Sequence, residues 1–320
     1  EMLTRDWSSD VCSSDLYDEM KRDTREFSGH DRYDYPDSIV RVTAGHGGEV
    51  ILIKGSEKTA LYDTGMAYCG RETAVNIKKA LNGRKLDYIL ASHTHYDHIG
   101  GIPYIKEAFP SARILGAEYA KYVFTRQGAH KVIKNLGIVA DKIYGKNRPE
   151  KIITEGMEVN DVIGEGDILD LGDEKVHVLE TKGHTDCSLA FYLEGRSLLL
   201  ASESTGICAG PGISNTAILK SFDDSIKSLE KCRKLQPERI ISPHYGMVPQ
   251  SYNKSYWDVF EEAAFEEKEY CVNLWKEGLT LDEMVKKAAE EFYGEERSKE
   301  QPYEAFVENA RANADRKSVV

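Results

Sequence analysis

The most informative segment of this sequence is Ser92-His93-Thr94-His95-Tyr96-Asp97-His98-Ile99-Gly100-Gly101. It follows an apolar run at residues 86–91 and precedes a segment with helical spacing. Three imidazoles and one carboxylate within six residues lose solvation and conformational freedom on folding unless something binds them. Imidazole together with carboxylate is a ligand set that Zn²⁺ prefers, so the pattern indicates half of a metal site rather than a solvated polar loop.

The spacing of these residues suggests how the ligands are shared. His93 and His95 are two residues apart after the predicted strand, so both side chains can point to the same side, while Asp97 and His98 can face a second ion. The motif His93-x-His95-x-Asp97-His98 resembles the signature of the metallo-β-lactamase-fold hydrolases, and further matches follow through most of residues 38–250. The resemblance implies an α/β fold, an αββα sandwich of two mixed sheets flanked by helices, with a one- or two-metal site between the sheet edges.

The bulk composition is that of an ordinary soluble globular protein. Of 320 residues, 41% are hydrophobic and 9% aromatic, which is ample for a packed core. The formal net charge of −12 and the pI near 5.3 argue against a nucleic-acid partner, because phosphate contacts need clustered Lys and Arg. No run approaches the roughly 18 apolar residues of a membrane span and no signal-peptide pattern is recognised, so we expect a cytoplasmic protein that binds no membrane.

The six cysteines and the chain ends set further expectations. No cysteines are paired as CxxC, which fits reduced thiols rather than a disulfide framework. Residues 5–16 resemble a translated sequencing-adapter sequence and 315–320 look like another, so 1–16 and 315–320 are expected to be non-native tails, with a genuine disordered tail as the alternative. Between them we expect a metallo-β-lactamase-like domain at 17–252 and a C-terminal helical extension at 253–314.

The first half of the chain alternates strand and helix signals, which is typical of sheets covered by helices. Asp63, at the end of the third strand, resembles the family aspartate that supports the ligands by hydrogen bonds, and an Asx-turn cap is a compatible alternative. His46 is expected to be an exposed turn histidine. Glycine and proline interrupt the pattern between about 128 and 165, where we expect substrate-shaping loops. The predicted strands are 38–42, 49–54, 59–62, 86–91 and 112–115, and the predicted helices are 71–82, 99–109 and 117–126.

Three further ligand candidates lie at strand ends in the second half. Thr181-Lys182-Gly183-His184-Thr185 resembles the T-x-G-H-T segment of the family, which nominates His184 as the third imidazole beside His93 and His95. Glu203 occupies the place of the usual bridging aspartate, and His244 resembles the histidine of the closing element. The resemblance therefore makes His244 the second-ion imidazole, paired with Asp97 and His98. Two other candidates, His177 within a strand and Cys187, are assigned packing or surface roles.

Two departures from the family pattern bear on the chemistry. Glu203 is one methylene longer than the usual aspartate, so a single occupied metal site stays an alternative to two. Tyr245 intervenes between His244 and Gly246 and places a phenol where it can donate to a developing oxyanion. We therefore interpret Asp97 and Tyr245 as the catalytic candidates.

Beyond Ser251 the sequence becomes helical. Residues 256–276 are long and amphipathic, and Thr280-Leu281-Asp282-Glu283 is a capping box that opens another helix. Pro302 fits the first turn of a last helix. Two roles stay open: a packing appendage over the sheet edge, or a lid or dimer element over the metal cleft. For the second role the candidate wall residues are aromatic: Tyr256, Trp257, Phe260 and Trp275.

The predicted chemistry is metal-dependent hydrolysis. Two divalent ions, zinc first with iron and manganese as alternatives, would supply a metal-bound hydroxide that attacks a small ester-like substrate such as a thioester or lactone, while Asp97 orients the hydroxide and shuttles its proton. No G-x-S-x-G is present and no cysteine has a convincing catalytic partner, which disfavours covalent catalysis. Phosphodiester hydrolysis, a di-iron redox centre of the same fold and a catalytically silent metal module remain alternatives, and a homodimer is left open.

Overall fold

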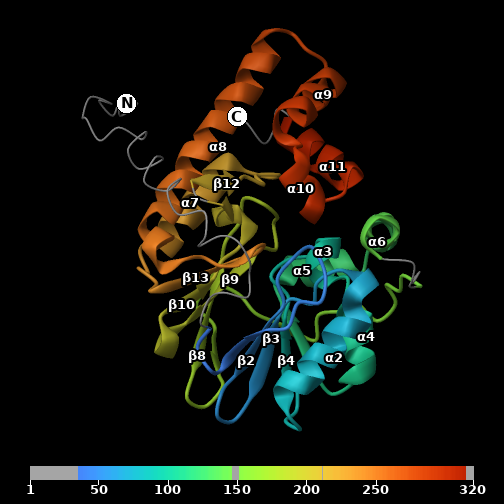
Figure 1. Ribbon diagram of the computed structural model, residues 1–320, viewed down its shortest axis with the longest axis vertical. Helices are drawn as coiled ribbons and strands as arrows, with labels where there is room; N and C mark the ends of the chain where they lie inside the picture. Colours follow the sequence, from blue (N-terminus) through green and yellow to red (C-terminus); the bar gives the residue numbers. More distant parts are fainter. Residues whose placement is uncertain (1–34, 146–150, 211, 315–320) are drawn as a thin grey trace.

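The computed structural model describes residues 35–145, 151–210 and 212–314, and the predicted tails at 1–16 and 315–320 lie outside them. In this part of the chain two six-stranded sheets form the centre of the molecule, and helices cover their outer sides (Figure 1). Both sheets mix parallel and antiparallel pairs. The predicted αββα sandwich with C-terminal helices is therefore confirmed.

The first sheet begins as an antiparallel meander and continues as a parallel sheet. Strands β1, β2 and β3 pair antiparallel, whereas β3, β4, β5 and β6 pair parallel. Parallel neighbours need crossover connections, and helices fill each of them. The strands in spatial order are β1 (Ile39–Arg41), β2 (Ile51–Lys54), β3 (Thr59–Tyr62), β4 (Tyr88–Leu90), β5 (Arg113–Gly116) and β6 (Asp161–Val162). The crossover helices are α2 (Gly70–Leu81), α3 (Tyr96–Ile99), α4 (Ile102–Ala108), α5 (Glu118–Phe124) and α6 (Gln127–Tyr144).

The second sheet has one parallel pair, β10 with β13, and its other pairs are antiparallel. Helix α7 (Phe222–Arg233) makes the crossover between β10 and β13. The strands in spatial order are β14 (Gly246–Met247), β13 (Arg239–Ser242), β10 (Leu198–Leu200), β9 (Leu189–Leu193), β8 (Lys175–Glu180) and β7 (Ile168–Asp170). A separate hairpin joins β11 (Ile207–Gly210) and β12 (Ile213–Asn215).

Successive residues of β10 show why this sheet is buried on both faces. Leu198 and Leu200 belong to the core between the two sheets, whereas Leu199 belongs to the core between the second sheet and its helices. This division follows from the alternation of side chains along a strand, and it explains why β10 reads as an unbroken apolar run. Between the sheets, the Tyr62 hydroxyl donates to the carbonyl of Ala201 at 3.0 Å.

One prediction for the first half is wrong. Residues 127–144, expected to contribute loops, form the 18-residue helix α6. The glycines suggested loops, but Gly137 lies inside the helix because packing requires a small residue there. A Cβ at this position would lie 3.0 Å from the Ile152 side chain. A small residue at this point allows the segment after residue 150 to approach the helix closely. The structure confirms the prediction for the cysteines, since those in the described ranges are free thiols.

The C-terminal helices pack beside the second sheet and over one end of the sandwich (Figure 1). They are α8 (Asn253–Lys276), α9 (Leu281–Phe292), α10 (Glu295–Glu300) and α11 (Tyr303–Ala314). The predicted capping box is present, because Thr280 and Glu283 bond reciprocally at the start of α9. Helices α9 and α11 share a small core of their own that includes Val285 and Phe306.

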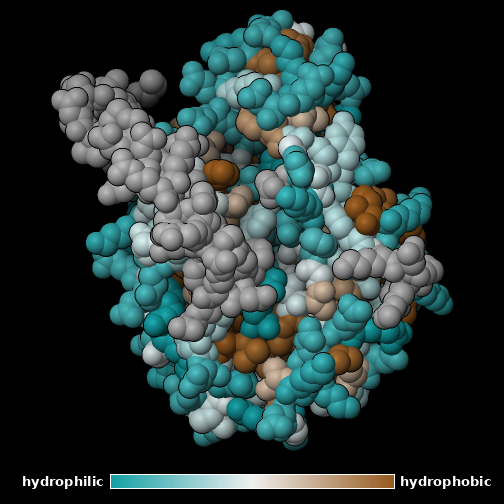
Figure 2. Space-filling model, in the orientation of Figure 1, coloured by the Kyte–Doolittle hydropathy of each residue, from teal (hydrophilic) through white to brown (hydrophobic). Residues whose placement is uncertain are grey.

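The aromatic residues proposed as a cleft wall lie elsewhere. Tyr256, Trp257 and Phe260 are buried between α8 and the second sheet, and Trp275 is 48% exposed. The three buried side chains stabilise the attachment of α8 to the second sheet. Within the described residues, no helix combines the length and the hydropathy that crossing a membrane requires. Much of the face in Figure 2 is hydrophilic.

Candidate metal centre

The candidate ligands lie just beyond the carboxyl ends of strands from both sheets. In the first sheet, β3 and β4 are parallel neighbours, so Asp63 and the loop from Ser92 onward leave the same edge. In the second sheet, β10 and β13 are parallel neighbours, which brings Glu203 beside His244. Strand β8 runs in the direction of β10, because each is antiparallel to β9, so His184 also leaves this edge. The two edges meet at the ligand residues.

The first cluster contains His93, His95, His184 and Glu203, whose candidate ligand atoms lie within 4.8 Å of one another. Nε2 of His184 is 3.2 Å from Nε2 of His93 and 2.9 Å from Nδ1 of His95. It is 3.0 Å from Oε2 of Glu203. Nitrogens that share a tetrahedral zinc ion at its usual bond length lie about 3.3 Å apart, so the spacing suits one such ion.

The second cluster contains Asp97, His98, His244 and again Glu203. Oε1 of Glu203 is 2.7 Å from Nε2 of His98 and 2.9 Å from Nε2 of His244. Oδ2 of Asp97 lies 3.6 Å from Nε2 of His244. The two carboxylate oxygens of Glu203 thus face different clusters, and the structure brings together all seven residues that the motifs nominated as ligands.

Hydrogen bonds behind the ligands fix which ring nitrogen faces the centre. Asp63 accepts from Nδ1 of His98 at 2.8 Å and from the Ser92 hydroxyl at 2.7 Å, and that hydroxyl in turn lies 3.0 Å from Nδ1 of His93. Nδ1 of His184 donates to the carbonyl of Ala217 at 2.6 Å. Each Nδ1 is engaged, so the Nε2 atoms of the three rings point inward, as they do in metal sites.

Local turns place the two residues that depart from the family pattern. Glu203 begins a short 3₁₀ turn, Glu203–Thr205, which Ser202 caps by accepting from the Ser204 amide. Tyr245 has a φ of 65°, in the left-handed region that aromatic residues rarely adopt, and follows His244 in the turn between β13 and β14. The backbone strain of such a residue, about 1–2 kcal/mol, is maintained only where surrounding structure holds it.

Burial and charge divide the histidines into two groups. Burial, reinforced by the neighbouring imidazoles, holds the pKa of His93 well below its usual value and lowers that of His95 to about 3. For His98, burial opposes protonation, but Asp97, Asp63 and Glu203 outweigh it and raise the pKa well above its usual value. Burial would raise the pKa of Glu203, but His184, His244 and His98 outweigh it and hold this pKa well below normal.

The donor set fits divalent metal ions. Neutral imidazoles and ionised carboxylates are the forms that coordinate such ions, and the lowered pKa values of His93 and Glu203 favour these forms. His93, His98 and His184 are almost completely buried, a costly position for polar rings whose Nε2 atoms face one another. Cations between the nitrogens would remove this cost, so the residues would serve as ligands for one or two ions.

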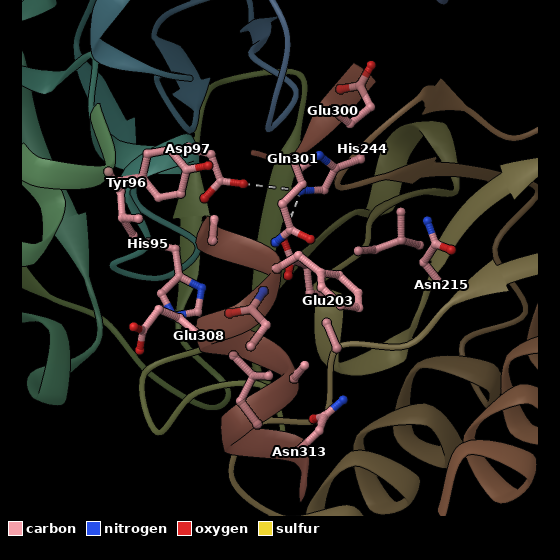
Figure 3. A pocket seen from close by; sticks show the side chains of 18 of the residues that line it. His95, Tyr96, Asp97, Glu203, Asn215, His244, Glu300, Gln301, Glu308 and Asn313 are labelled. Carbon is pink, nitrogen blue, oxygen red and sulfur yellow. Dashed lines mark hydrogen bonds and ion pairs between the residues drawn. The ribbon is translucent and has the colours of Figure 1, made fainter. Parts of the chain in front are cut away.

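A cavity of about 360 Å³ opens beside the clusters. His95, Asp97, Glu203 and His244 face it from the sandwich (Figure 3). Gln301, between α10 and α11, and Glu308 and Asn313 of α11 face it from the other side. Tyr245 also lines the cavity, as do Ile133 and Leu136 of α6. Sequence reasoning missed the wall residues of α6, α10 and α11. The sequence feature that could have pointed to them is the amphipathic pattern of the last helices. Such a pattern does not specify which surface a helix faces.

The other residues considered in the sequence have identifiable contacts. His46 is 46% exposed in its turn, as expected, and its Nδ1 lies 3.6 Å from Oε1 of Glu300 in α10. His177 is half-buried on β8 and 3.1 Å from Glu194. Cys187 is buried against Thr94 and Thr185, which agrees with packing.

The family profile of the Metallo-beta-lactamase superfamily matches residues 44–244. This match spans more than half of the chain and includes every candidate ligand. The chain belongs to the metallo-beta-lactamase superfamily. It is accordingly assigned as a hydrolase of that superfamily, with the substrate unassigned.

Individual relatives are distant. Glyoxylase B2 from Dictyostelium discoideum is 23% identical over 258 residues, which cover 76% of this chain and 79% of the relative. A hydroxyacylglutathione hydrolase from Aliivibrio fischeri is 30% identical over 106 residues, 33% of this chain and 29% of the relative. The rubredoxin-oxygen oxidoreductase of Megalodesulfovibrio gigas is 24% identical over 191 residues, 59% and 40% of the two chains.

Among solved structures, a metallo-beta-lactamase family protein from Thermus thermophilus superposes with a TM-score of 0.57 at 18% identity. The superposition covers 87% of this chain and 93% of that one. At this identity the likeness supports the fold alone.

Proposed function

We propose that this protein hydrolyses a small ester-like acyl substrate, such as a thioester or a lactone, with divalent metal ions. The observation that carries the proposal is the convergence of six side chains on the two carboxylate oxygens of Glu203 at the wall of a cavity. The named activity of the hydroxyacylglutathione hydrolase, which cleaves an acyl group from glutathione, favours thioesters among the acyl compounds.

Two sets of residues would hold the metal ions. His93, His95 and His184 would bind the first, and Asp97, His98 and His244 the second, with Glu203 between them. Zinc is the metal we expect first, since nitrogen and oxygen ligands at this spacing suit it. When bound, such ions lower the pKa of a coordinated water towards about 7 and polarise a carbonyl oxygen.

Asp97 is the residue that we propose as proton carrier. Its carboxylate lies at the cavity surface, with Oδ2 3.6 Å from His244 and 3.8 Å from His98. A carboxylate that faces both the ligands and the substrate space can accept a proton from the attacking water and return it to the leaving group.

Tyr245 is the proposed donor to the oxyanion. Its left-handed backbone and its place after His244 put the residue on the cavity wall beside the second cluster. A phenol at that position can donate a hydrogen bond to the oxygen on which charge develops during acyl transfer.

The test combines metal content with a substrate panel. Protein purified without added metal is analysed for bound metals, stripped with a chelator, and reloaded separately with zinc, manganese or iron. Thioesters, lactones and bis(4-nitrophenyl) phosphate are then assayed in parallel. Metal-dependent turnover of thioesters or lactones supports the proposal. Turnover confined to the phosphodiester, or no turnover by metal-loaded protein, contradicts it.

A redox function has one specific point in its favour, namely the similarity to the rubredoxin-oxygen oxidoreductase. The same purified protein tests it. Bound iron together with oxygen consumption linked to NADH through added electron carriers would favour that reading over hydrolysis.

A further inference from the structure

Arg297 is a cation in the wall of the cavity that the proposed hydrolysis does not use. It lies in α10, outside the stretch of residues 44–244 that the family profile matches. Among the described residues that line the cavity, it is the only one with a permanent positive charge. Acidic residues of the same wall include Glu267, Glu300 and Glu308, so this guanidinium stands out against an acidic lining.

The guanidinium of Arg297 has few partners in the structure. One Nη donates to the carbonyl of Thr216 at 3.4 Å, and the group lies over the ring of Phe306 at 5.2 Å from its centroid. Within the ranges that the structure describes, no carboxylate lies within ion-pairing distance of it. A guanidinium has five N–H donors in a planar fork, and within the described part of the chain only the Thr216 carbonyl accepts from this one, so donors remain for a ligand in the cavity that Arg297 lines.

Glu267 of α8 is the nearest candidate for an internal counter-ion, and its properties argue against that role. It accepts from the Asn313 amide at 2.8 Å, and burial raises its pKa to about 7 despite the nearby Arg297. A carboxylate in a close ion pair would show the opposite shift. Burial also lowers the pKa of Arg297, as expected for a buried cation that lacks a compensating anion.

Contacts of α10 with the sandwich hold Arg297 in place. Oε2 of Glu300 accepts from the amide of Gly47 at 3.1 Å, and the Tyr144 hydroxyl donates to the carbonyl of Ser298 at 2.9 Å. Arg297 lies in the same helical turn as these two bonds. They attach this turn to the loop between β1 and β2 and to α6. The guanidinium is thus positioned before any ligand arrives, which reduces the entropy lost on binding.

The other residues of the cavity wall indicate the size and the polarity of the rest of the ligand. Ile133 and Leu136 of α6, Ile207 of β11, and Phe306 of α11 give the cavity apolar surface. A volume of about 360 Å³ is at the lower end of the range for small-molecule sites. The cavity therefore suits a compact ligand with an apolar segment and one anionic end.

We propose that Arg297 is a specificity-determining residue that binds a carboxylate of the substrate, so that the preferred substrates are acyl compounds bearing a negative charge. The inference rests on the proposed acyl hydrolysis and narrows its substrate class. Arg297 binds the carboxylate through two parallel N–H donors, while the acyl carbon lies at the ligand clusters. The carboxylate belongs either to the acyl portion or to the leaving portion of the substrate.

Three thioesters separate these cases. S-acetyl-N-acetylcysteamine is neutral, S-succinyl-N-acetylcysteamine carries the charge on the acyl portion, and S-acetyl-3-mercaptopropionate carries it on the thiol portion. We expect the wild-type protein to prefer one of the two anionic thioesters. In Arg297→Gln, the ratio of kcat/KM for that thioester to kcat/KM for the neutral one should fall about 10- to 100-fold, mainly through KM, as expected for a lost charge-assisted hydrogen bond. Arg297→Lys keeps the positive charge but lacks the planar pair of N–H donors. Its kcat/KM ratio should therefore lie between those of wild type and Arg297→Gln.

A matched control and a binding measurement keep the outcomes distinct. Arg311→Gln removes an arginine of α11 that is paired with Asp282 at the surface, and it should leave the ratio unaltered. An equal loss for neutral and anionic thioesters in Arg297→Gln would overturn the proposal. If wild-type protein hydrolyses no thioester, the proposed function fails, and calorimetry with glutarate against glutaramide then tests Arg297 directly. Weaker binding of glutarate alone in Arg297→Gln supports the carboxylate site, and equal binding in both proteins rejects it.

Discussion

The sheet sandwich and the C-terminal helices meet at one cavity, and they contribute to it by different means. The candidate ligands follow strand ends, are mostly buried, and are oriented by hydrogen bonds to Asp63, Ser92 and the Ala217 carbonyl. The opposite wall comes from α10 and α11, and α11 packs with α9 around a small core of its own. The ligand side of the cavity is thus held by hydrogen bonds within the sandwich, whereas the opposite wall depends on packing among the C-terminal helices.

The largest expected effect concerns the sandwich. His184→Ala removes a ligand candidate shared by the contacts to His93, His95 and Glu203. We expect loss of bound metal and a fall in kcat greater than the roughly 100-fold that removing an outer partner costs. Metal analysis and steady-state kinetics measure it. His177→Ala, on the strand β8 of the same sheet, is the matched control, and a His184→Ala protein with normal metal and turnover would contradict the assignment of the centre.

The next prediction tests whether the helical wall is separable. Phe306→Ala removes a buried aromatic ring from the α9–α11 core and should destabilise that unit by about 3 kcal/mol. We expect faster hydrogen exchange in α9 and α11 together with a higher KM, because the cavity loses a wall. Metal content should stay at the wild-type level. Val307→Ala on the same helix removes less apolar volume and should have a smaller effect, whereas loss of metal in Phe306→Ala would show that the two regions are one unit.

Asp63→Asn tests whether hydrogen bonds behind the candidate ligands orient them for metal binding. Asp63 has a φ of 51°, a conformation that asparagine tolerates, so the substitution changes the charge and the hydrogen bonds to His98 and Ser92 more than the backbone. We expect metal affinity to weaken about 10- to 100-fold. Competition with a chromogenic chelator measures it. The exposed Asp258→Asn is the control, and unchanged affinity in Asp63→Asn would mean that the ligands need no such orientation.

The smallest predicted effect is a pH dependence in the helical region. Burial raises the pKa of Glu267, which faces Arg297 and Asn313, from 4.5 to about 7. The folded state therefore binds more protons than the unfolded state between these values, and Glu267 makes stability fall as pH rises from about 4.5 to about 7. In Glu267→Gln this component should vanish, so the free energy of unfolding at pH 8 should rise relative to wild type and lose the part of its pH dependence that lies between about 4.5 and 7. Denaturant titrations at pH 5 and pH 8 measure the difference, and the same pH slope in both proteins would contradict the prediction.

Short sequence patterns predicted the parts of this protein that depend on local chemistry. The His-rich turn and the segment around His184 follow apolar strands directly, so their places at the strand ends could be derived from residue order. The capping box at Thr280 is equally local. Helix α6 was missed because Gly137 reads as a helix breaker, and only its packing against Ile152 shows why a helix accepts it there.

Residue order alone specified the candidate ligand types and the strand ends that carry them, because these follow from residues close together in the chain. What the ligands face depends on how distant segments pack. Glu203 reaches both clusters, and Arg297 reaches the cavity, because elements far apart in the chain pack against one another. An amphipathic helix specifies that one face is buried but not against which surface, so the choice of substrate wall depends on packing that no local pattern encodes.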